Sequence, residues 1–183
     1  IYGGHQYGGI EEACKKLGQK GKEVWMTEYL INWNENSGSP RNYDYSKDVF
    51  NFFRSINTCM LNDFNAWIHY AAKRYYAMLG DGQYGTANGE MTKRGYVMAH
   101  FAKYITGMTR IDAQWNDNAS VPLEGSVYLS QTGDTVVAVL INPSYDVRTV
   151  TFDLPFYTLR GRMQTTTETK NLAPKDLRQK TET

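Results

Sequence analysis

The chain has 183 residues, of which 41% are hydrophobic and 21% are charged, and its formal net charge is +1. These values predict a globular chain with one or two packed cores, and they give no basic surface for nucleic acid. No run of about 18 apolar residues occurs, so the sequence predicts no membrane span. Two cysteines show neither a disulfide framework nor metal-ligand spacing, and no metal site is predicted.

The first part of the chain alternates predicted strands with predicted helices. Strand ends are predicted within residues 1–9, 24–28 and 64–70, and helices at residues 10–17, at residues 46–62 and from about Thr92 onward. Strand and helix in alternation are typical of a parallel α/β fold. Three such units are less than half of an eight-unit barrel.

The pattern changes near Gly107. Strands are predicted over residues 126–131 and 147–153, where apolar residues alternate, and over residues 135–142, which are β-branched and apolar; residues 132–134 are a predicted turn. They predict an antiparallel sheet module, followed by polar sequence without a final apolar strand. We therefore expect an α/β part at residues 1–106 and a β part at residues 107–183. The start within a motif and the polar end lead us to expect a chain that is cut at both ends.

Glu28 lies where a predicted buried strand ends. Residues 24–26 are β-branched, aromatic and apolar, Gly21 precedes them, and residues 32–40 are rich in turn formers. In parallel α/β barrels, catalytic side chains gather at the carboxyl ends of the strands. A solvated or salt-bridged glutamate is the plain alternative, and spacing alone favours it because acidic residues are mostly exposed.

Three segments resemble glycoside hydrolase family 30, which includes the bacterial glucuronoxylanases. Residues 21–28, GKEVWMTE, resemble the segment that holds the family's catalytic nucleophile. Residues 92–104, followed by Arg110–Ala113, resemble the last barrel helix and the link into a β side domain. His5-x-Tyr7 matches the family's pattern at the preceding strand end. The similarity extends from residue 1 to about residue 155.

The resemblance implies the C-terminal part of a (β/α)8 TIM barrel, followed by an incomplete antiparallel β-sandwich side domain. It implies a retaining endo-glycosidase that hydrolyses β-1,4-xylan, either glucuronoxylan or arabinoxylan, with two carboxyl groups about 5–5.5 Å apart. Glu28 would be the nucleophile. The general acid/base would lie upstream of Ile1, so we expect the 183-residue chain to be inactive by itself.

The resemblance also implies the substrate-binding residues, which are His5, Tyr7, Tyr29, Trp33, Tyr70, Arg74 and Tyr76. Arg74 matches the arginine that recognises the glucuronate of the substrate, a task that suits a bidentate guanidinium. His69 and Tyr70 stand where the glucuronoxylanases have two tryptophans. The plain alternatives are that His5 and Tyr7 are packing residues and that Arg74 is a solvated loop charge.

Three classes of function stay open at this point. The first is a glycosidase acting on xylan, with relatives that act on β-glucan or glucosyl lipids as its nearest neighbours. The second is a non-catalytic sugar-binding protein, and the third is a structural α/β fragment. The ordered match of residues 25–28 and 93–96 favours the glycosidase. With the family come a polysaccharide substrate, no cofactor, a monomer, and a secreted or cell-surface location.

Overall fold

The computed structural model describes residues 1–7, 9–30, 45–154 and 160–177, and its fold is α/β plus β. In chain order the elements are β1 (Tyr2–His5), α1 (Glu12–Gln19), β2 (Val24–Tyr29), α2 (Tyr45–Leu61), β3 (Ala66–His69), α3 (Lys93–Ala102), β4 (Thr109–Ile111), β5 (Glu124–Leu129), β6 (Val136–Ile141), β7 (Arg162–Thr165) and β8 (Ala173–Asp176). The elements predicted before residue 142 are confirmed to within a few residues. Strand β4 was not predicted.

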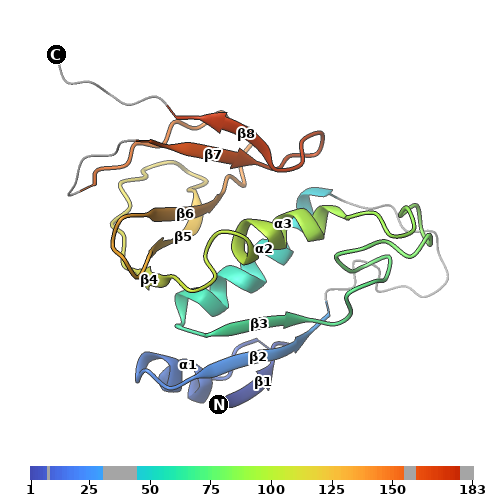
Figure 1. Ribbon diagram of the computed structural model, residues 1–183, viewed down its shortest axis with the longest axis horizontal. Coiled ribbons are helices and arrows are strands. Elements are labelled where there is room, and N and C mark those ends of the chain that lie inside the picture. The colour runs from blue at the N-terminus through green and yellow to red at the C-terminus, as the bar shows by residue number, and fades with distance from the viewer. Residues whose placement is uncertain (8, 31–44, 155–159, 178–183) are drawn as a thin grey trace.

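The first three strands form a parallel sheet in the order β1-β2-β3, with α1 and α2 in the two connections. Val24 and Met26 alternate along β2 and are 0% and 1% exposed, because they belong to the core that this sheet shares with α2. Figure 1 shows α2 and α3 together on one side of the sheet. The parallel arrangement brings the carboxyl ends of all three strands to one edge.

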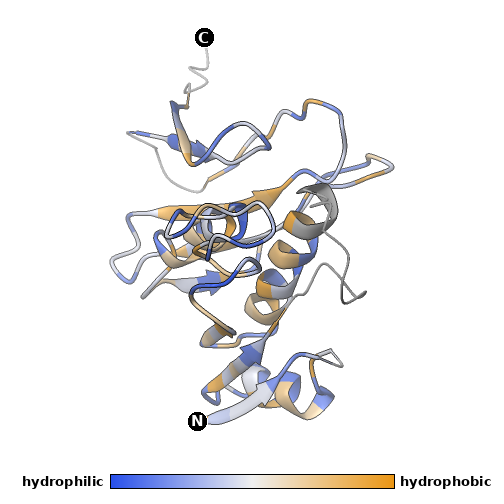
Figure 2. Cartoon of the chain, turned by 90° about the vertical axis from the view of Figure 1, so that its right-hand side faces the viewer, coloured by the Kyte–Doolittle hydropathy of each residue, from blue (hydrophilic) through white to orange (hydrophobic). Residues whose placement is uncertain are grey.

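One apolar core joins the parallel sheet to the helices and to the antiparallel strands beyond them. Its buried members outside the parallel sheet include Val49, Phe52, Phe53 and Ile56 of α2, Val97 and Phe101 of α3, Tyr128 of β5 and Val139 of β6. In Figure 1 the two helices lie between β1–β3 and β4–β6. In Figure 2 the hydrophobic residues are concentrated in the middle of the molecule, away from the two termini. Helix α2 is therefore packed on two sides, which fixes its position behind the strand ends.

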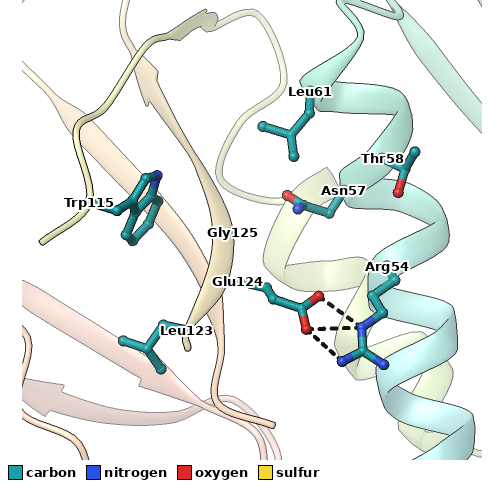
Figure 3. A pocket seen from close by; sticks show the side chains of 8 residues that line it. All are labelled: Arg54, Asn57, Thr58, Leu61, Trp115, Leu123, Glu124 and Gly125. Carbon is teal, nitrogen blue, oxygen red and sulfur yellow. Dashed lines mark hydrogen bonds and ion pairs between the residues drawn. The ribbon is translucent and has the colours of Figure 1, made fainter. Parts of the chain in front are cut away.

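Strands β4, β5 and β6 form an antiparallel sheet in that order. The strands approach closely at Gly125, where a Cβ atom would lie 2.3 Å from the Val139 carbonyl oxygen. Arg54 of α2 forms an ion pair with Glu124 of β5, with 2.5 Å between Arg54 Nη2 and Glu124 Oε1 (Figure 3). This pair and the shared core attach the sheet to α2.

The strand predicted over residues 147–153 is wrong, since these residues are not in a strand. Val147 is 98% exposed, and no strand within the described ranges pairs with it. Arg148 instead forms an ion pair with Asp117, with 2.6 Å between Nη2 and Oδ1. The alternation of apolar residues was real, but a strand also needs a neighbour to complete its hydrogen bonds.

The polar C-terminal stretch forms an antiparallel hairpin of β7 and β8. Both strands are short and polar, as the sequence RMQT of β7 and APKD of β8 shows, so neither is an apolar strand. The hairpin is tied to α3 by Lys93, whose Nζ donates to the Thr167 carbonyl at 2.7 Å and to Asn171 Oδ1 at 2.6 Å. Hydrogen bonds from α3 thus hold a segment that offers little apolar surface.

Candidate active site

The carboxyl ends of β1, β2 and β3 lie side by side at one edge of the parallel sheet. His5 lies opposite Glu28, and Tyr29 lies opposite His69. The pairing register shifts near this edge in both ladders, so the main chain departs from a regular strand where these side chains emerge. Sites in parallel α/β folds form at this edge of the sheet. The structure therefore gathers several of the predicted site residues in one place.

Glu28 is half-buried and accepts a hydrogen bond from Tyr7, with 2.8 Å between the phenol oxygen and Oε1. Partial burial, this hydrogen bond and the negative charge of Glu28 raise the pKa of Tyr7 to about 12. Tyr7 therefore stays protonated at neutral pH and acts as the donor. The hydrogen bond holds one oxygen of the Glu28 carboxylate in a fixed orientation, which a nucleophile needs.

Aromatic rings continue from Tyr7 along the strand ends. The ring centroids of His5 and Tyr7 are 5.9 Å apart, and those of Tyr7 and Tyr29 are 5.7 Å apart. The ring of Tyr29 packs edge-on against the buried Trp67, with 6.5 Å between the ring centroids. Because Tyr7 is 53% exposed, it can contact a ligand while Tyr29 and Trp67 connect the row to the core. His5, Tyr7, Glu28 and Tyr29 thus form one contiguous group.

The segment after β3 carries the other predicted site residues. Tyr70 is 52% exposed, and its phenol lies near enough to Tyr7 to contribute to the raised pKa of Tyr7. Arg74 is exposed, and its guanidinium makes no hydrogen bond or ion pair with the described residues. Tyr76 is half-buried, with its ring 6.5 Å from that of His69. Trp33 lies outside the described residues.

His69 supports this segment from the core side as an uncharged imidazole. Its ring is stacked on Trp67, with 5.8 Å between centroids and 25° between planes. Burial, followed by the positive charge of Arg94, lowers the pKa of His69 to about 4. Nδ1 lies 3.4 Å from the Ala71 carbonyl oxygen, and the buried Nε2 has no hydrogen-bond partner among the described residues. His69 is therefore neutral at neutral pH and is not a proton donor to the site in that range.

The start of α3 holds the same segment, a role that the sequence did not reveal. Thr92 caps the helix by accepting a hydrogen bond from the Gly95 amide. Arg94 is 1% exposed, and its Nη1 donates to the Tyr76 carbonyl at 2.5 Å. A Cβ atom on Gly95 would lie 2.6 Å from the Met78 carbonyl oxygen, so the loop packs directly on the helix. The local sequence carries no signal for this contact, because an arginine in the first turn of a helix is usually exposed.

Two cavities lie beside α2. One has a volume of about 330 Å³ and adjoins the candidate site; it is lined by Gln6, Tyr7, Gly9, Tyr29, Asn51, Arg54, Ser55 and Thr58. The other has a volume of about 300 Å³ and lies between α2 and β5; Figure 3 shows its lining residues, among them Trp115, Asn57 and Glu124. None of the predicted site residues lines this second cavity, although it shares Arg54 and Thr58 with the first.

The groups at the strand ends are a carboxylate, phenols and an imidazole. Such groups can supply a nucleophile and hydrogen-bond donors to a bound ligand. Within residues 1–7, 9–30, 45–154 and 160–177, no group of three or more His, Cys, Asp and Glu side chains is arranged to hold a metal ion. In the same ranges, no helix has both the length and the apolar composition that a membrane span requires.

No protein-family model matches the chain. Over 129 residues it is 37% identical to the glucuronoxylanase XynC of Bacillus subtilis (strain 168), an alignment that covers 68% of this chain and 26% of the relative. A glucuronoxylanase XynC described from Bacillus subtilis is 36% identical over 127 residues, covering 67% of this chain and 26% of the relative. The chain is related to the xylanases of glycoside hydrolase family 30.

This relation confirms the resemblance that residues 21–28 and 92–104 carried. The chain spans about a quarter of the length of each relative, 26% in both cases. The relation therefore concerns one part of each xylanase, and it does not by itself assign a role to any residue at the strand ends. Those roles depend on the geometry around Glu28.

Proposed function

We propose that this chain is the C-terminal part of a retaining endo-glycosidase that hydrolyses β-1,4-xylan. The observation that carries the proposal is the Tyr7–Glu28 hydrogen bond of 2.8 Å at the carboxyl end of a parallel strand. The similarity to two glucuronoxylanases supports the choice of xylan as the substrate. In this proposal residues 1–106 are the last units of a (β/α)8 barrel, and residues 107–183 are part of a β-sandwich side domain.

Glu28 acts as the nucleophile in the proposed reaction. Its carboxylate oxygen attacks the anomeric carbon, and the bond from that carbon to the leaving sugar oxygen breaks as a second carboxyl group protonates this oxygen. Water then displaces Glu28 from the glycosyl-enzyme, with the second group acting as general base. The second carboxyl group lies about 5–5.5 Å from Glu28 in such enzymes. We place it outside this chain, upstream of Ile1, and the reaction needs no cofactor.

Tyr7 has two tasks in this mechanism. Its donated hydrogen bond orients the Glu28 carboxylate before the attack. When Glu28 becomes an ester, the negative charge on its oxygens is lost and the bond weakens, so Tyr7 also stabilises Glu28 as the leaving group of the second step. The raised pKa of Tyr7, about 12, keeps the phenol proton in place throughout.

The exposed residues around Glu28 form the proposed sugar-binding surface. His5 and Tyr29 flank the Tyr7–Glu28 pair, and Tyr70 and Tyr76 lie on the segment after β3. Aromatic rings bind the flat faces of sugars while their polar edges stay in water. Arg74 has a guanidinium available to a ligand, and it would pair with the carboxylate of a glucuronate side group. Trp33 belongs to the same proposed surface.

The assignment of Glu28 is tested by replacing it with glutamine in the complete enzyme. Glu28→Gln keeps the shape of the side chain but removes the nucleophile, so kcat on glucuronoxylan should fall roughly a thousandfold or more with little change in melting temperature. Glu23→Gln is the matched control, because Glu23 lies just before the same strand and accepts a hydrogen bond from Trp25 Nε1. The control should keep wild-type turnover.

Near-normal turnover by Glu28→Gln would refute the nucleophile assignment. A complete protein that binds xylan but releases no reducing sugar, with or without the substitution, would show instead that it is a sugar-binding protein. Turnover of β-glucan in place of xylan by the complete enzyme would show that its substrate is a different polymer. Secretion and a monomeric state are further parts of the proposal, and size-exclusion chromatography of the culture medium tests both.

A further inference from the structure

Gln6 lies between His5 and Tyr7 but points to the other side of the strand end. Tyr7 is 53% exposed, whereas Gln6 is 8% exposed. Successive side chains on an extended chain alternate between two faces, so the two residues have opposite surroundings. Tyr7 faces the candidate site, and the Gln6 side chain reaches α2.

The Gln6 amide is held by a buried hydrogen-bond network. Its Nε2 donates to the Ser55 carbonyl at 3.3 Å, and its Oε1 accepts from Ser55 Oγ at 2.8 Å. Oε1 also accepts from Trp67 Nε1 at 3.2 Å. Ser55 is 7% exposed and Trp67 is 8% exposed, so water does not readily replace these bonds. The amide therefore ties the end of β1 to both α2 and β3.

The same residue touches the strand that carries Glu28. The main-chain nitrogen of Gln6 donates to the main-chain carbonyl of Glu28 at 3.4 Å. This bond lies just after the register shift between Gly4 and His5. A regular ladder therefore does not fix the main chain at this point. The next residue, Tyr7, donates its phenol proton to the Glu28 side chain. The position of the phenol thus depends on how the main chain is held at Gln6.

We propose that Gln6 is a positioning residue for the nucleophile: its buried amide fixes the end of β1 so that the Tyr7 phenol reaches the Glu28 carboxylate. Gln6 contacts neither the substrate nor the reacting atoms in this role and acts through Tyr7. The proposal rests on the proposed function of Glu28.

A double-mutant cycle in the complete enzyme tests the inference. Gln6→Met keeps the length of the side chain but makes none of the amide's hydrogen bonds, and Tyr7→Phe removes the phenol. We expect Tyr7→Phe to lower kcat about ten- to hundredfold, which is the loss of one hydrogen bond to a charged group. Gln6→Met should lower kcat about five- to fiftyfold, with KM changed less than about threefold. In the Tyr7→Phe background, Gln6→Met should cost less than about threefold more.

Activity measured well below the melting temperature separates positioning from general destabilisation. Both single variants should lower kcat at saturating substrate while the protein is fully folded, because a missing or misplaced phenol affects the attack on the sugar. Asn65→Ala is the structural control, because Asn65 Oδ1 accepts from the Val24 amide at 2.8 Å where β2 begins. It should lower the melting temperature without lowering kcat. Ser55→Ala, which removes the hydroxyl that donates to Gln6 Oε1 and accepts from Trp67 Nε1, replaces Gln6→Met if that variant does not fold.

Three results would overturn the inference. The first is a wild-type kcat in Gln6→Met or Ser55→Ala despite a lowered melting temperature. The second is a double variant in which the losses of Gln6→Met and Tyr7→Phe simply multiply. The third is a loss of kcat in Asn65→Ala that matches the loss in Gln6→Met. Any of these, combined with an inactive Glu28→Gln, rejects the role of Gln6 alone, whereas an active Glu28→Gln rejects the proposed function itself.

Discussion

The ends of β2 and β3 are neighbours in the sheet, but the chain holds them in different ways. At the end of β2, side chains determine the geometry: Tyr7 bonds the Glu28 carboxylate directly, and Gln6 is anchored beneath it. After β3, hydrogen bonds to the main chain determine it, as in the bonds from the Arg74 amide to the Leu79 carbonyl and from Arg94 to the Tyr76 carbonyl. The first region holds one carboxylate in one place. The second supports a loop whose outer side chains are available to a ligand.

This difference suggests a division of labour between chemistry and specificity. A nucleophile must keep a fixed position, because small displacements from the reacting atom cost rate. A residue that distinguishes substrates needs only a stable loop beneath it, so Tyr70 and Arg74 can be replaced with little effect on the fold. Substitutions near Glu28 should therefore change all substrates alike, and substitutions after β3 should change some substrates more than others.

The largest expected effect concerns the first region. If Glu28 supplies one of two carboxyl groups, the 183-residue chain by itself should release no reducing sugar from xylan above background. Adding the upstream part of the complete enzyme in the same chain should restore activity. Clear activity of the 183-residue chain would mean that the acid/base lies within it, and that the division between the two regions is drawn in the wrong place.

The next effect concerns the loop after β3. Arg74→Ala should lower kcat/KM on glucuronoxylan about ten- to hundredfold, which corresponds to about 1.5–3 kcal/mol for a charge-assisted contact. On undecorated xylan the loss should be small, because no carboxylate is present. Lys73→Ala is the matched control, since Lys73 is the adjacent exposed cation. Equal losses on both polymers would show that Arg74 supports the loop instead of reading the substrate.

A smaller effect tests how the loop is held from below. Burial and the charge of Arg94 lower the pKa of His69 to about 4 in the folded protein, against about 6.5 in an unfolded chain. Between these pH values the unfolded chain binds more protons. The free energy of unfolding should therefore fall as the pH drops from about 6.5 to about 4, with a share of about 1–3 kcal/mol from His69.

His69→Phe keeps a ring against Trp67 but removes the titration, so it should flatten this part of the stability profile. Denaturant unfolding of the complete enzyme at several pH values measures the effect. His100 is also buried, and burial lowers its pKa, so some decline should remain in the variant. If the free energy of unfolding of His69→Phe depended on pH as in the wild type, burial would not lower the pKa of His69.

Much of the parallel part of the fold could be predicted from local sequence. Apolar residues such as Val24 and Met26 mark a buried strand, and Glu28 at its end marks the edge where sites form. Local pattern does not predict the contact between Tyr7 and Glu28, because it depends on the register between two strands; only the family resemblance placed both residues in one cleft. Alternation did place Gln6 on the face opposite Tyr7, which is a signal for a buried amide.

Other features lie beyond local pattern. Arginine is mostly exposed in proteins, so nothing about Arg94 predicted that it would be buried beneath a loop. The apolar alternation around Val147 predicted a strand, but alternation does not reveal whether a neighbouring strand exists. The hairpin of β7 and β8 shows the reverse case, a pair of strands without an apolar pattern. Tertiary hydrogen bonds from Lys93 hold it, and such bonds leave no periodic signal in the sequence.

The most direct test of the central claim is to trap the covalent intermediate on Glu28. A 2-fluoro xylobioside with a good leaving group slows the second step of a retaining glycosidase, so the complete enzyme should accumulate a stable glycosyl ester. Tryptic digestion places Glu28 in a peptide of residues 23–41, which also contains Glu23 and Glu35. The account predicts that tandem mass spectrometry finds the sugar on Glu28 and none on the Glu28→Gln variant. A sugar attached to another residue, or rapid turnover with no ester, would contradict it.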